Sequence, residues 1–201
     1  MHTANKDAII ALDLGPQTNL TPQLQAYFDK CEEKLGFVPN VLRAYAFDNA
    51  KLQAFIDMVD DLMLADSGIS KLEREMIAVA VSAINHCHYC LTAHGAAVRQ
   101  RAKDPIMGEL IAQNWRAANL PAKQQAMLEF VEKLTQSPAT IDDADRAALR
   151  LAGFTDRDIW DIASTAAFYN MSNRLAAATD MKPNSEYHFT ARGPSANRIK
   201  T

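Results

Sequence analysis

The sequence lacks a long apolar run and a leader segment. No apolar stretch approaches the roughly 20 residues that are needed to span a bilayer. Residues 1–13 contain no basic segment followed by an apolar core, so they do not resemble a signal peptide. These absences predict a soluble, cytoplasmic protein without a membrane partner.

Glycine and strand-forming patterns are also scarce. Only 7 of the 201 residues are glycine, and no segment alternates apolar and polar residues with enough β-branched side chains to make a strand. Alanine and leucine are plentiful instead. The sequence therefore predicts an all-α fold, and its 48% of apolar residues can fill the core of a single-domain helical bundle.

The sequence also has no large excess of charge of one sign and no disulfide framework. The net charge of -3 comes from interspersed acids and bases without a basic patch, which argues against a nucleic-acid or anionic membrane partner. Three cysteines, of which two lie close together in the sequence, do not make the disulfide framework of a secreted domain. The three cysteines are more consistent with a protein of a reducing compartment that has one special cysteine pair.

Apolar residues recur at helical spacing in eight segments that are bounded by proline, glycine or capping residues. The predicted helices cover about residues 22–35, 41–65, 71–84, 87–101, 105–118, 122–136, 142–152 and 155–180. Two of them begin with capping boxes, formed by Ser70 with Glu73 and, more weakly, by Thr155 with Asp158. Asn49 can mark a break in the second helix.

The helical domain is expected to span residues 21–182. We assign residues 1–20 to an N-terminal extension and residues 183–201, which are polar and poor in helix-forming patterns, to a C-terminal tail. Two interpretations of the tail stay open, a flexible end and an arm that becomes ordered on a neighbouring subunit.

Cys87 and Cys90 lie at the predicted start of a helix. Residues three apart on a helix share a face, with β-carbons about 5–6 Å apart, so the two thiols can form a reversible disulfide with little backbone movement. Unpaired backbone N–H groups and the helix dipole at this end favour a thiolate. His94 lies one turn after Cys90 on the same face, where its imidazole can accept the thiol proton. This pattern indicates thiol redox chemistry.

Glu75 is a further candidate, because a carboxylate on a helical face that continues through Ala78, Val79 and Ser82 needs a partner. Spacing alone does not bring it to the cysteines. In a simple antiparallel hairpin His94 would lie opposite about Ser82, a couple of turns from Glu75. The two helices would therefore have to cross steeply.

Other residues have simpler interpretations. Cys31 lies on an apolar helical stripe and is expected to be a buried core thiol without chemistry. His86 and His88 are expected to be polar residues of a turn. The last long helix carries aromatic and polar residues at helical spacing that we assign to packing and interfaces: Phe168, Tyr169, Asn170, Asn173 and Arg174.

Glu75, the motif Cys87-His88-Tyr89-Cys90 and His94 together resemble the core signature of the alkylhydroperoxidase AhpD-like family, within the carboxymuconolactone decarboxylase-like superfamily. The residue runs 72–75, 85–90 and 36–40 also look like the peroxidase-related branch of this family. The resemblance covers about residues 20–180, and its most specific part is the segment 72–99.

The resemblance implies an all-helical homo-oligomer, a dimer or a trimer of dimers, that reduces hydroperoxides. Cys90 would attack the peroxide, Cys87 would resolve the sulfenic acid into a disulfide, and His94 with Glu75 would relay protons. An unknown thiol would then reduce the disulfide. One position departs from the family pattern, because Tyr89 stands where the prototype has a second histidine and His88 lies one residue earlier.

Other classes of function stay open. Cys87, Cys90 and His94, with His86 or His88, could supply a tetrahedral zinc site, although structural zinc usually joins separated chain segments. A non-catalytic helical oligomer could use the same scaffold for association alone. No phosphate-binding loop, dinucleotide fingerprint or haem-attachment motif is present, so we expect neither a cofactor nor a metal ion.

Overall fold

The structure, a computed structural model, describes residues 8–193, and every regular element in this part is a helix. This confirms the all-α prediction. Among the same residues, no helix has both the length and the apolar character that crossing a membrane requires. The elements in chain order are α1 (Pro22–Leu35), α2 (Asn40–Tyr45), α3 (Asn49–Leu64), α4 (Lys71–Ile84), α5 (His88–Ala102), α6 (Met107–Asn114), η1 (Trp115–Ala118), α7 (Ala122–Gln136), η2 (Pro138–Thr140), α8 (Asp143–Leu151), α9 (Asp156–Ala178) and η3 (Ser185–His188).

Helices α4 and α9 begin at the predicted capping boxes. At the start of α4 the Ser70 hydroxyl accepts from the Glu73 backbone N–H at 3.2 Å, and the Glu73 carboxylate accepts from the Ser70 N–H at 2.7 Å. Thr155 and Asp158 make the same reciprocal pair at the start of α9. Each box satisfies two backbone N–H groups that a helix start would otherwise leave unpaired.

Two predicted helices are interrupted in the structure. The segment 41–65 is divided into α2 and α3, because the Asp48 carboxylate accepts from two backbone N–H groups and so starts a new helix. This confirms a break beside Asn49. The segment 105–118 is helical as α6 but continues only as the 3-10 turn η1, which the Asn114 side chain caps.

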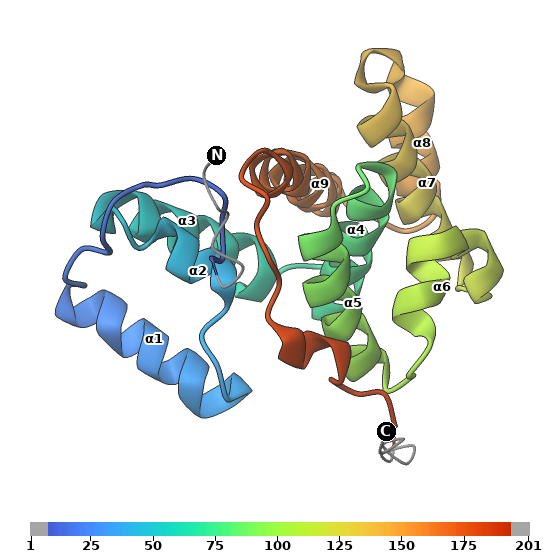
Figure 1. Cartoon of the computed structure of the whole chain (residues 1–201). Helices are drawn as coiled ribbons and strands as arrows, with labels where there is room; N and C mark the ends of the chain where they lie inside the picture. Colours follow the sequence, from blue (N-terminus) through green and yellow to red (C-terminus); the bar gives the residue numbers. More distant parts are fainter. Residues whose placement is uncertain (1–7, 194–201) are drawn as a thin grey trace.

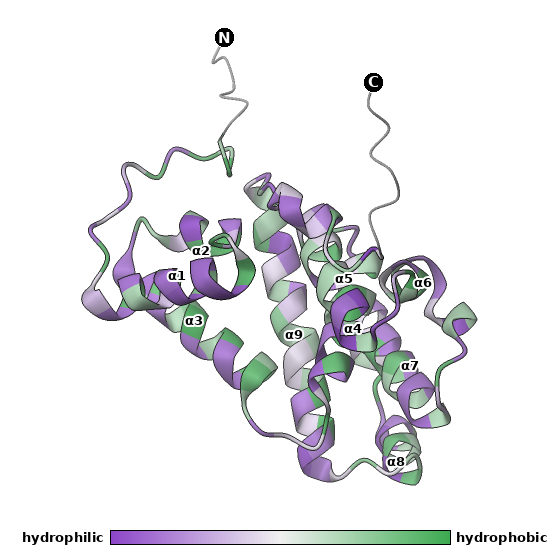
Figure 2. Ribbon diagram, turned by 90° about the horizontal axis from the view of Figure 1, so that it is seen from below, coloured by the Kyte–Doolittle hydropathy of each residue, from purple (hydrophilic) through white to green (hydrophobic). Residues whose placement is uncertain are grey.

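Helix α9 lies between two groups of helices (Figure 1). Helices α1, α2 and α3 lie on one side of it, and the α4–α5 hairpin with α6, α7 and α8 lies on the other side, as the view from below in Figure 2 also shows. Side chains from both groups and from α9 form one core cluster, which includes the fully buried Leu24, Leu52, Ile77, Val79, Met127, Leu128 and Ile162. One contiguous core therefore joins the bundle.

The chain that follows α9, residues 183–193, runs back along α5 (Figure 1). The buried Arg99 guanidinium of α5 donates to the carbonyl groups of Tyr187 and Thr190 at 2.9 and 3.1 Å. These residues, called the C-terminal segment below, therefore pack on their own chain. Residues 194–201 of the predicted tail, and residues 1–7 of the predicted extension, lie outside the described residues.

Candidate active site

The turn between α4 and α5 places the cysteine pair at a helix start. His86 adopts the left-handed backbone conformation, with a φ of 53°, and so reverses the chain after α4. The Cys87 N–H then donates to the Ser82 carbonyl at 2.9 Å, and Cys87 takes the N-cap position of α5. Cys90 follows in the first turn. The predicted position of the pair at a helix start is confirmed.

Both cysteines of the pair are free thiols, and they are almost completely buried, with exposed fractions of 3% for Cys87 and 2% for Cys90. The Cys90 thiol is hydrogen-bonded to Cys87 and lowers the pKa of Cys87 to about 6, and the backbone N–H groups of Cys90 and Tyr89 also favour this thiolate. The same hydrogen bond, together with burial, raises the pKa of Cys90. Near neutral pH the pair therefore holds one negative charge and one shared proton.

Glu75 and His94 are in direct contact. The distance from Glu75 Oε2 to His94 Nδ1 is 2.7 Å, and Arg101 Nε lies 3.6 Å from the other carboxylate oxygen. Glu75 and His94 therefore meet, although a simple antiparallel hairpin would place His94 opposite about Ser82, a couple of turns from Glu75. Only residues 85–87 separate α4 from α5, and this short turn brings His94 of α5 within reach of Glu75 on α4.

Tyr169 of α9 completes the surroundings of His94. Its hydroxyl oxygen lies 3.5 Å from His94 Nδ1, and the two rings meet edge to face with centroids 4.7 Å apart. Burial raises the pKa of Tyr169 well above its usual value, so the phenol keeps its proton. Since Nδ1 of His94 is taken by Glu75, Nε2 is the ring nitrogen left to exchange protons.

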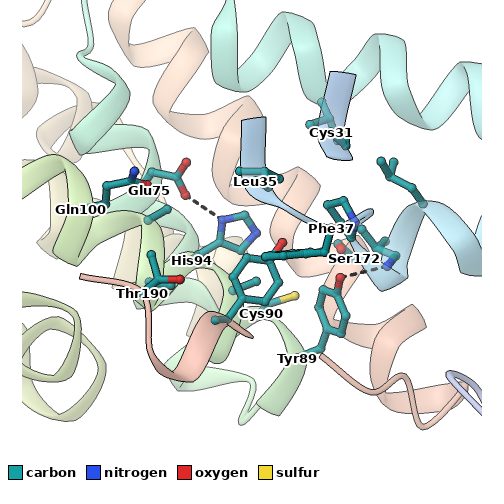
Figure 3. A pocket seen from close by; sticks show the side chains of 18 of the residues that line it. Cys31, Leu35, Phe37, Glu75, Tyr89, Cys90, His94, Gln100, Ser172 and Thr190 are labelled. Atoms are coloured by element: carbon teal, nitrogen blue, oxygen red, sulfur yellow. Dashed lines mark hydrogen bonds and ion pairs between the residues drawn. The ribbon is translucent and has the colours of Figure 1, made fainter. Parts of the chain in front are cut away.

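A cavity of about 390 Å³ opens onto Cys90, His94 and Glu75 (Figure 3). Its walls come from α1 and the loop after it, from α2, α3, α4, α5 and α9, and from the C-terminal segment, and their aromatic and aliphatic members include Phe37, Leu42, Phe55, Val59, Phe168 and Tyr187. Cys87 is not among the described residues that line it. A small molecule in the cavity would therefore meet the pair from the Cys90 side.

Tyr89, the position that departs from the family pattern, has a structural role. It is buried, and its hydroxyl accepts from the Val41 backbone N–H of α2 at 2.9 Å. Burial raises the pKa of Tyr89, so the phenol keeps its proton. His88 is not among the described residues that line the cavity, and its ring lies near that of His188, with centroids 6.3 Å apart. Tyr89 also lines the cavity, but its hydroxyl is held by the Val41 N–H, whereas His88 lies away from the cavity.

Several residues that line the cavity were assigned to packing or to the tail on sequence grounds. Cys31 packs against the core as predicted, but it is only partly buried and also lines the cavity. Phe168 and Tyr169 pack in the core as predicted, and both also form cavity wall. Tyr187 of the C-terminal segment meets Phe37 edge to face, with centroids 5.0 Å apart. Their only sequence signal was an apolar or aromatic face, which core packing explains equally well.

A metal site is not assembled in the part of the chain that the structure describes. No three histidine, cysteine or acidic side chains among residues 8–193 are grouped so that they could hold a metal ion. The set of Cys87, Cys90 and His94 with His86 or His88, which the zinc interpretation requires, does not come together there.

Fold and site together define an all-helical protein with a dithiol at a helix start and a carboxylate–histidine pair beside it. A profile of the carboxymuconolactone decarboxylase family matches residues 49–133, which contain all four candidate residues. No curated protein matches the sequence.

Solved structures agree with this profile. A peroxidase-related protein from Silicibacter sp. TM1040 is 55% identical, with a TM-score of 0.90 over 94% of this chain and 100% of that chain. A peroxidase-related protein from Ralstonia eutropha JMP134, described as an alkylhydroperoxidase AhpD core, is 40% identical, with a TM-score of 0.87 over 93% and 98% of the two chains. The debrominase Bmp8 shares the fold, at 21% identity and a TM-score of 0.71 over 85% and 90% of the chains. The chain therefore belongs to the alkylhydroperoxidase AhpD-like family of the carboxymuconolactone decarboxylase-like superfamily, in its peroxidase-related branch.

Proposed function

We propose that this protein is a thiol-dependent peroxidase that reduces hydroperoxides with Cys87 and Cys90. The observation that carries the proposal is the position of Cys90, which borders a largely apolar cavity together with His94, while Cys87 lies behind it. Membership of the AhpD-like family and the peroxidase-related names of two relatives support the proposal.

In the first step the Cys90 thiolate attacks the terminal oxygen of the hydroperoxide. The O–O bond breaks, its electron pair leaves with the alkoxide, and a proton delivered by His94 converts the alkoxide into an alcohol. Cys90 is oxidised to a sulfenic acid. Glu75 contributes by holding the Nδ1 side of the His94 ring, which leaves Nε2 to give and take the proton.

In the second step Cys87, which holds the remaining proton of the pair, gives up that proton and attacks the Cys90 sulfur. The S–O bond breaks, a disulfide forms, and the departing hydroxide takes up the proton released by Cys87 to become water. An external thiol then reduces the disulfide and closes the cycle. One hydroperoxide is converted into one alcohol and one water for every two thiols that are oxidised.

The resting charge and the reacting sulfur lie on different residues. Hydrogen bonds from Cys90 and from backbone N–H groups favour the negative charge on Cys87, and burial disfavours a charge on Cys90, whereas the cavity reaches Cys90. The protonation states belong to the hydrogen-bonded pair and not to either residue alone, because one proton is shared between the two sulfurs. Transfer of this proton to Cys87 makes Cys90 the thiolate, so the sulfur that meets the substrate is the one that reacts.

The test of the proposed function is peroxide consumption by the wild type and by Cys90→Ser, each with a small monothiol, a small dithiol and a dithiol protein as reductant. We expect turnover by the wild type with at least one of these, and none above background for Cys90→Ser. Cys31→Ser is the matched cysteine control. Cys31 also lines the cavity, but it lies on α1, away from His94 (Figure 3), so this variant should lose far less turnover than Cys90→Ser. Equal turnover by the wild type and Cys90→Ser would contradict the proposal.

A further inference from the structure

Helix α9 carries a buried amide behind the cysteine pair, that of Asn173. Its exposed fraction is 1%, and its side chain lies close enough to Cys87 and Cys90 to lower the pKa of both thiols. Its Nδ2 also donates to the Ser82 hydroxyl at 3.0 Å, and the Ser82 carbonyl holds the Cys87 N–H. An amide has one donor end and one acceptor end, so its effect on a thiolate depends on which end faces the sulfur atoms.

A series of hydrogen bonds fixes the orientation of this amide. It starts at Arg174, whose guanidinium has only donors and gives one to Asn170 Oδ1 at 2.9 Å. Because Asn170 presents an acceptor, the atom of Asn85 that lies 3.0 Å from it is the donor Nδ2. The same Nδ2 lies 3.0 Å from Asn173, which must present Oδ1 to it. The Nδ2 of Asn173 is therefore left to face Ser82 and the sulfur atoms.

A donor in this position stabilises a negative charge on sulfur. Hydrogen bonds to an ionised acceptor are about twice as strong as those between neutral groups, and the buried pair has little access to water that could replace the amide. The hydrogen bond from Cys90 and the backbone N–H groups of Cys90 and Tyr89 lower the pKa of Cys87 most, and the Asn173 amide adds to their effect; it also opposes the increase in the pKa of Cys90.

We propose that Asn173 is a thiolate-stabilising residue, held by Arg174, Asn170 and Asn85 with its N–H donor against Cys87 and Cys90, and that it keeps the reduced pair ionised. This inference deepens the proposed function and rests on the thiol chemistry assigned to the same site. Because a stabilised thiolate stabilises the reduced form, Asn173 also makes the disulfide a stronger oxidant.

Other titratable groups lie around the pair and the cavity, on every element that packs there. They are Tyr27, Cys31 and Lys34 on α1, Glu75 on α4, Tyr89, His94 and Arg101 on α5, Tyr169 on α9 and Tyr187 of the C-terminal segment. A change that is confined to Asn173 leaves all of these groups in place, so a shift in the ionisation of the thiols can be assigned to the amide.

The decisive variant is Asn173→Asp, which keeps the shape of the side chain but replaces the donor with a carboxylate oxygen. The measurement is the rate at which iodoacetamide alkylates the reduced protein as a function of pH, because this rate follows the thiolate fraction. We expect the midpoint of the profile to rise by about one pH unit or more, so that the rate below both midpoints falls about tenfold. The reduction potential of the disulfide should become more negative, by about 30 mV for each tenfold change.

Asn170→Asp is the matched control. Position 170 accepts hydrogen bonds from both Arg174 and Asn85, and a carboxylate accepts them equally well. The change removes only the donation of Asn170 Nδ2 to the Ala166 carbonyl and the Thr135 hydroxyl, which lies outside this series of hydrogen bonds. Each donor and acceptor in the series of hydrogen bonds from Arg174 to Asn173 therefore keeps its role, and the alkylation profile of Asn170→Asp should overlay that of the wild type. A merely structural role of the asparagines would predict similar behaviour of the two variants.

An Asn173→Asp profile that overlays the wild type, or an equal shift in Asn170→Asp, would overturn the inference. If Asn173→Asp does not fold, Asn173→Leu removes the donor without adding charge, and it must also raise the midpoint; an unshifted Leu profile counts equally against the role of Asn173. Alkylation requires neither peroxide nor reductant. A protein that shows the shift but no peroxide turnover would therefore reject the proposed function and keep the inference about Asn173.

Discussion

At the scale of single residues, the reactivity of the cysteine pair depends on charge and on access, and the two favour different sulfur atoms. The pKa of Cys87 is depressed to about 6, so the thiolate is present above that pH and is lost as the pH falls through it. The cavity, however, reaches Cys90. At limiting iodoacetamide we expect the alkylation rate to rise through about pH 6 and Cys90 to be modified first, as peptide mass spectrometry would show. Preferential modification of Cys87 would reverse the roles of the two cysteines.

The same pair should form a reversible intramolecular disulfide. Cys87 is the N-cap of α5 and Cys90 lies in its first turn, and their thiols are already in hydrogen-bond contact, so only a small movement is required. Mass spectrometry of peroxide-treated protein should show the Cys87–Cys90 link, with Cys31 still free. Two free thiols in the pair after treatment would reject the redox mechanism.

Glu75 and His94 should act as one proton-transfer unit. Their contact of 2.7 Å fixes the ring nitrogen that carries the proton, so the loss of either partner disables the same step. We expect Glu75→Gln and His94→Asn each to slow peroxide turnover by about 10²- to 10⁴-fold. The double variant should be scarcely slower than the poorer single variant, because residues that act as one unit are strongly non-additive. Independent multiplication of the two losses would separate Glu75 from the relay.

At the scale of the elements, the α4–α5 turn depends on the left-handed backbone of His86. A β-branched residue is strained in this conformation, so His86→Val should lower the free energy of unfolding by about 1–2 kcal/mol. His86→Gly is the matched control, because glycine adopts positive φ without strain, and it should unfold in urea close to the wild type. An equal loss in both variants would show that the imidazole matters more than the backbone conformation.

Capping residues that are close in the sequence predicted where helices begin, whereas contacts between distant parts of the chain could not be predicted from such local patterns. Ser70 and Glu73 satisfy each other within a single turn, so the sequence alone specifies where α4 begins. The contact between Glu75 and His94 depends on the length and path of the turn between α4 and α5. In this turn His86 adopts the left-handed backbone conformation, which the spacing of apolar residues does not predict. A simple hairpin register therefore placed these two residues too far apart.

The candidate site likewise has a part that the sequence predicted and a part that it did not. Cys87, Cys90 and His94 are neighbours on one helix, so their spacing and the family motif were sufficient to single them out. The cavity in front of them depends on α1 and on the C-terminal segment, which arrive from distant parts of the chain. Tyr187 has no local feature that distinguishes a cavity wall from a polar tail. Its position follows from the two carbonyl groups that Arg99 holds.

At the scale of the whole molecule, α9 presents an apolar face to solvent. Trp160, Met171 and Leu175 lie on one side of this helix, with exposed fractions of 71%, 50% and 39%. Exposed apolar side chains that gather on one face are typical of protein–protein contacts. We propose that this face contributes to a homo-oligomer, a dimer at least and a trimer of dimers by family resemblance. Light scattering at micromolar concentration should show more than one subunit.

The double variant Trp160→Glu with Met171→Glu should shift this protein toward the monomer, because it places two charges in the proposed contact. Met58→Glu is the matched control. Met58 is equally exposed, at 50%, but it lies on α3, outside this face. A wild-type protein that scatters as a monomer, or equal dissociation by both variants, would contradict the proposed interface.

The wall that Tyr187 adds to the cavity has a consequence for biosynthesis. Translation runs from the N-terminus, so Cys90 is made about 100 residues before Tyr187, which corresponds to about 5–20 s at typical rates of synthesis. During this interval the growing chain already carries its cysteine pair, but the last part of the cavity does not yet exist. The pair thus acquires its complete enclosure only after Tyr187 has been made and has left the ribosome.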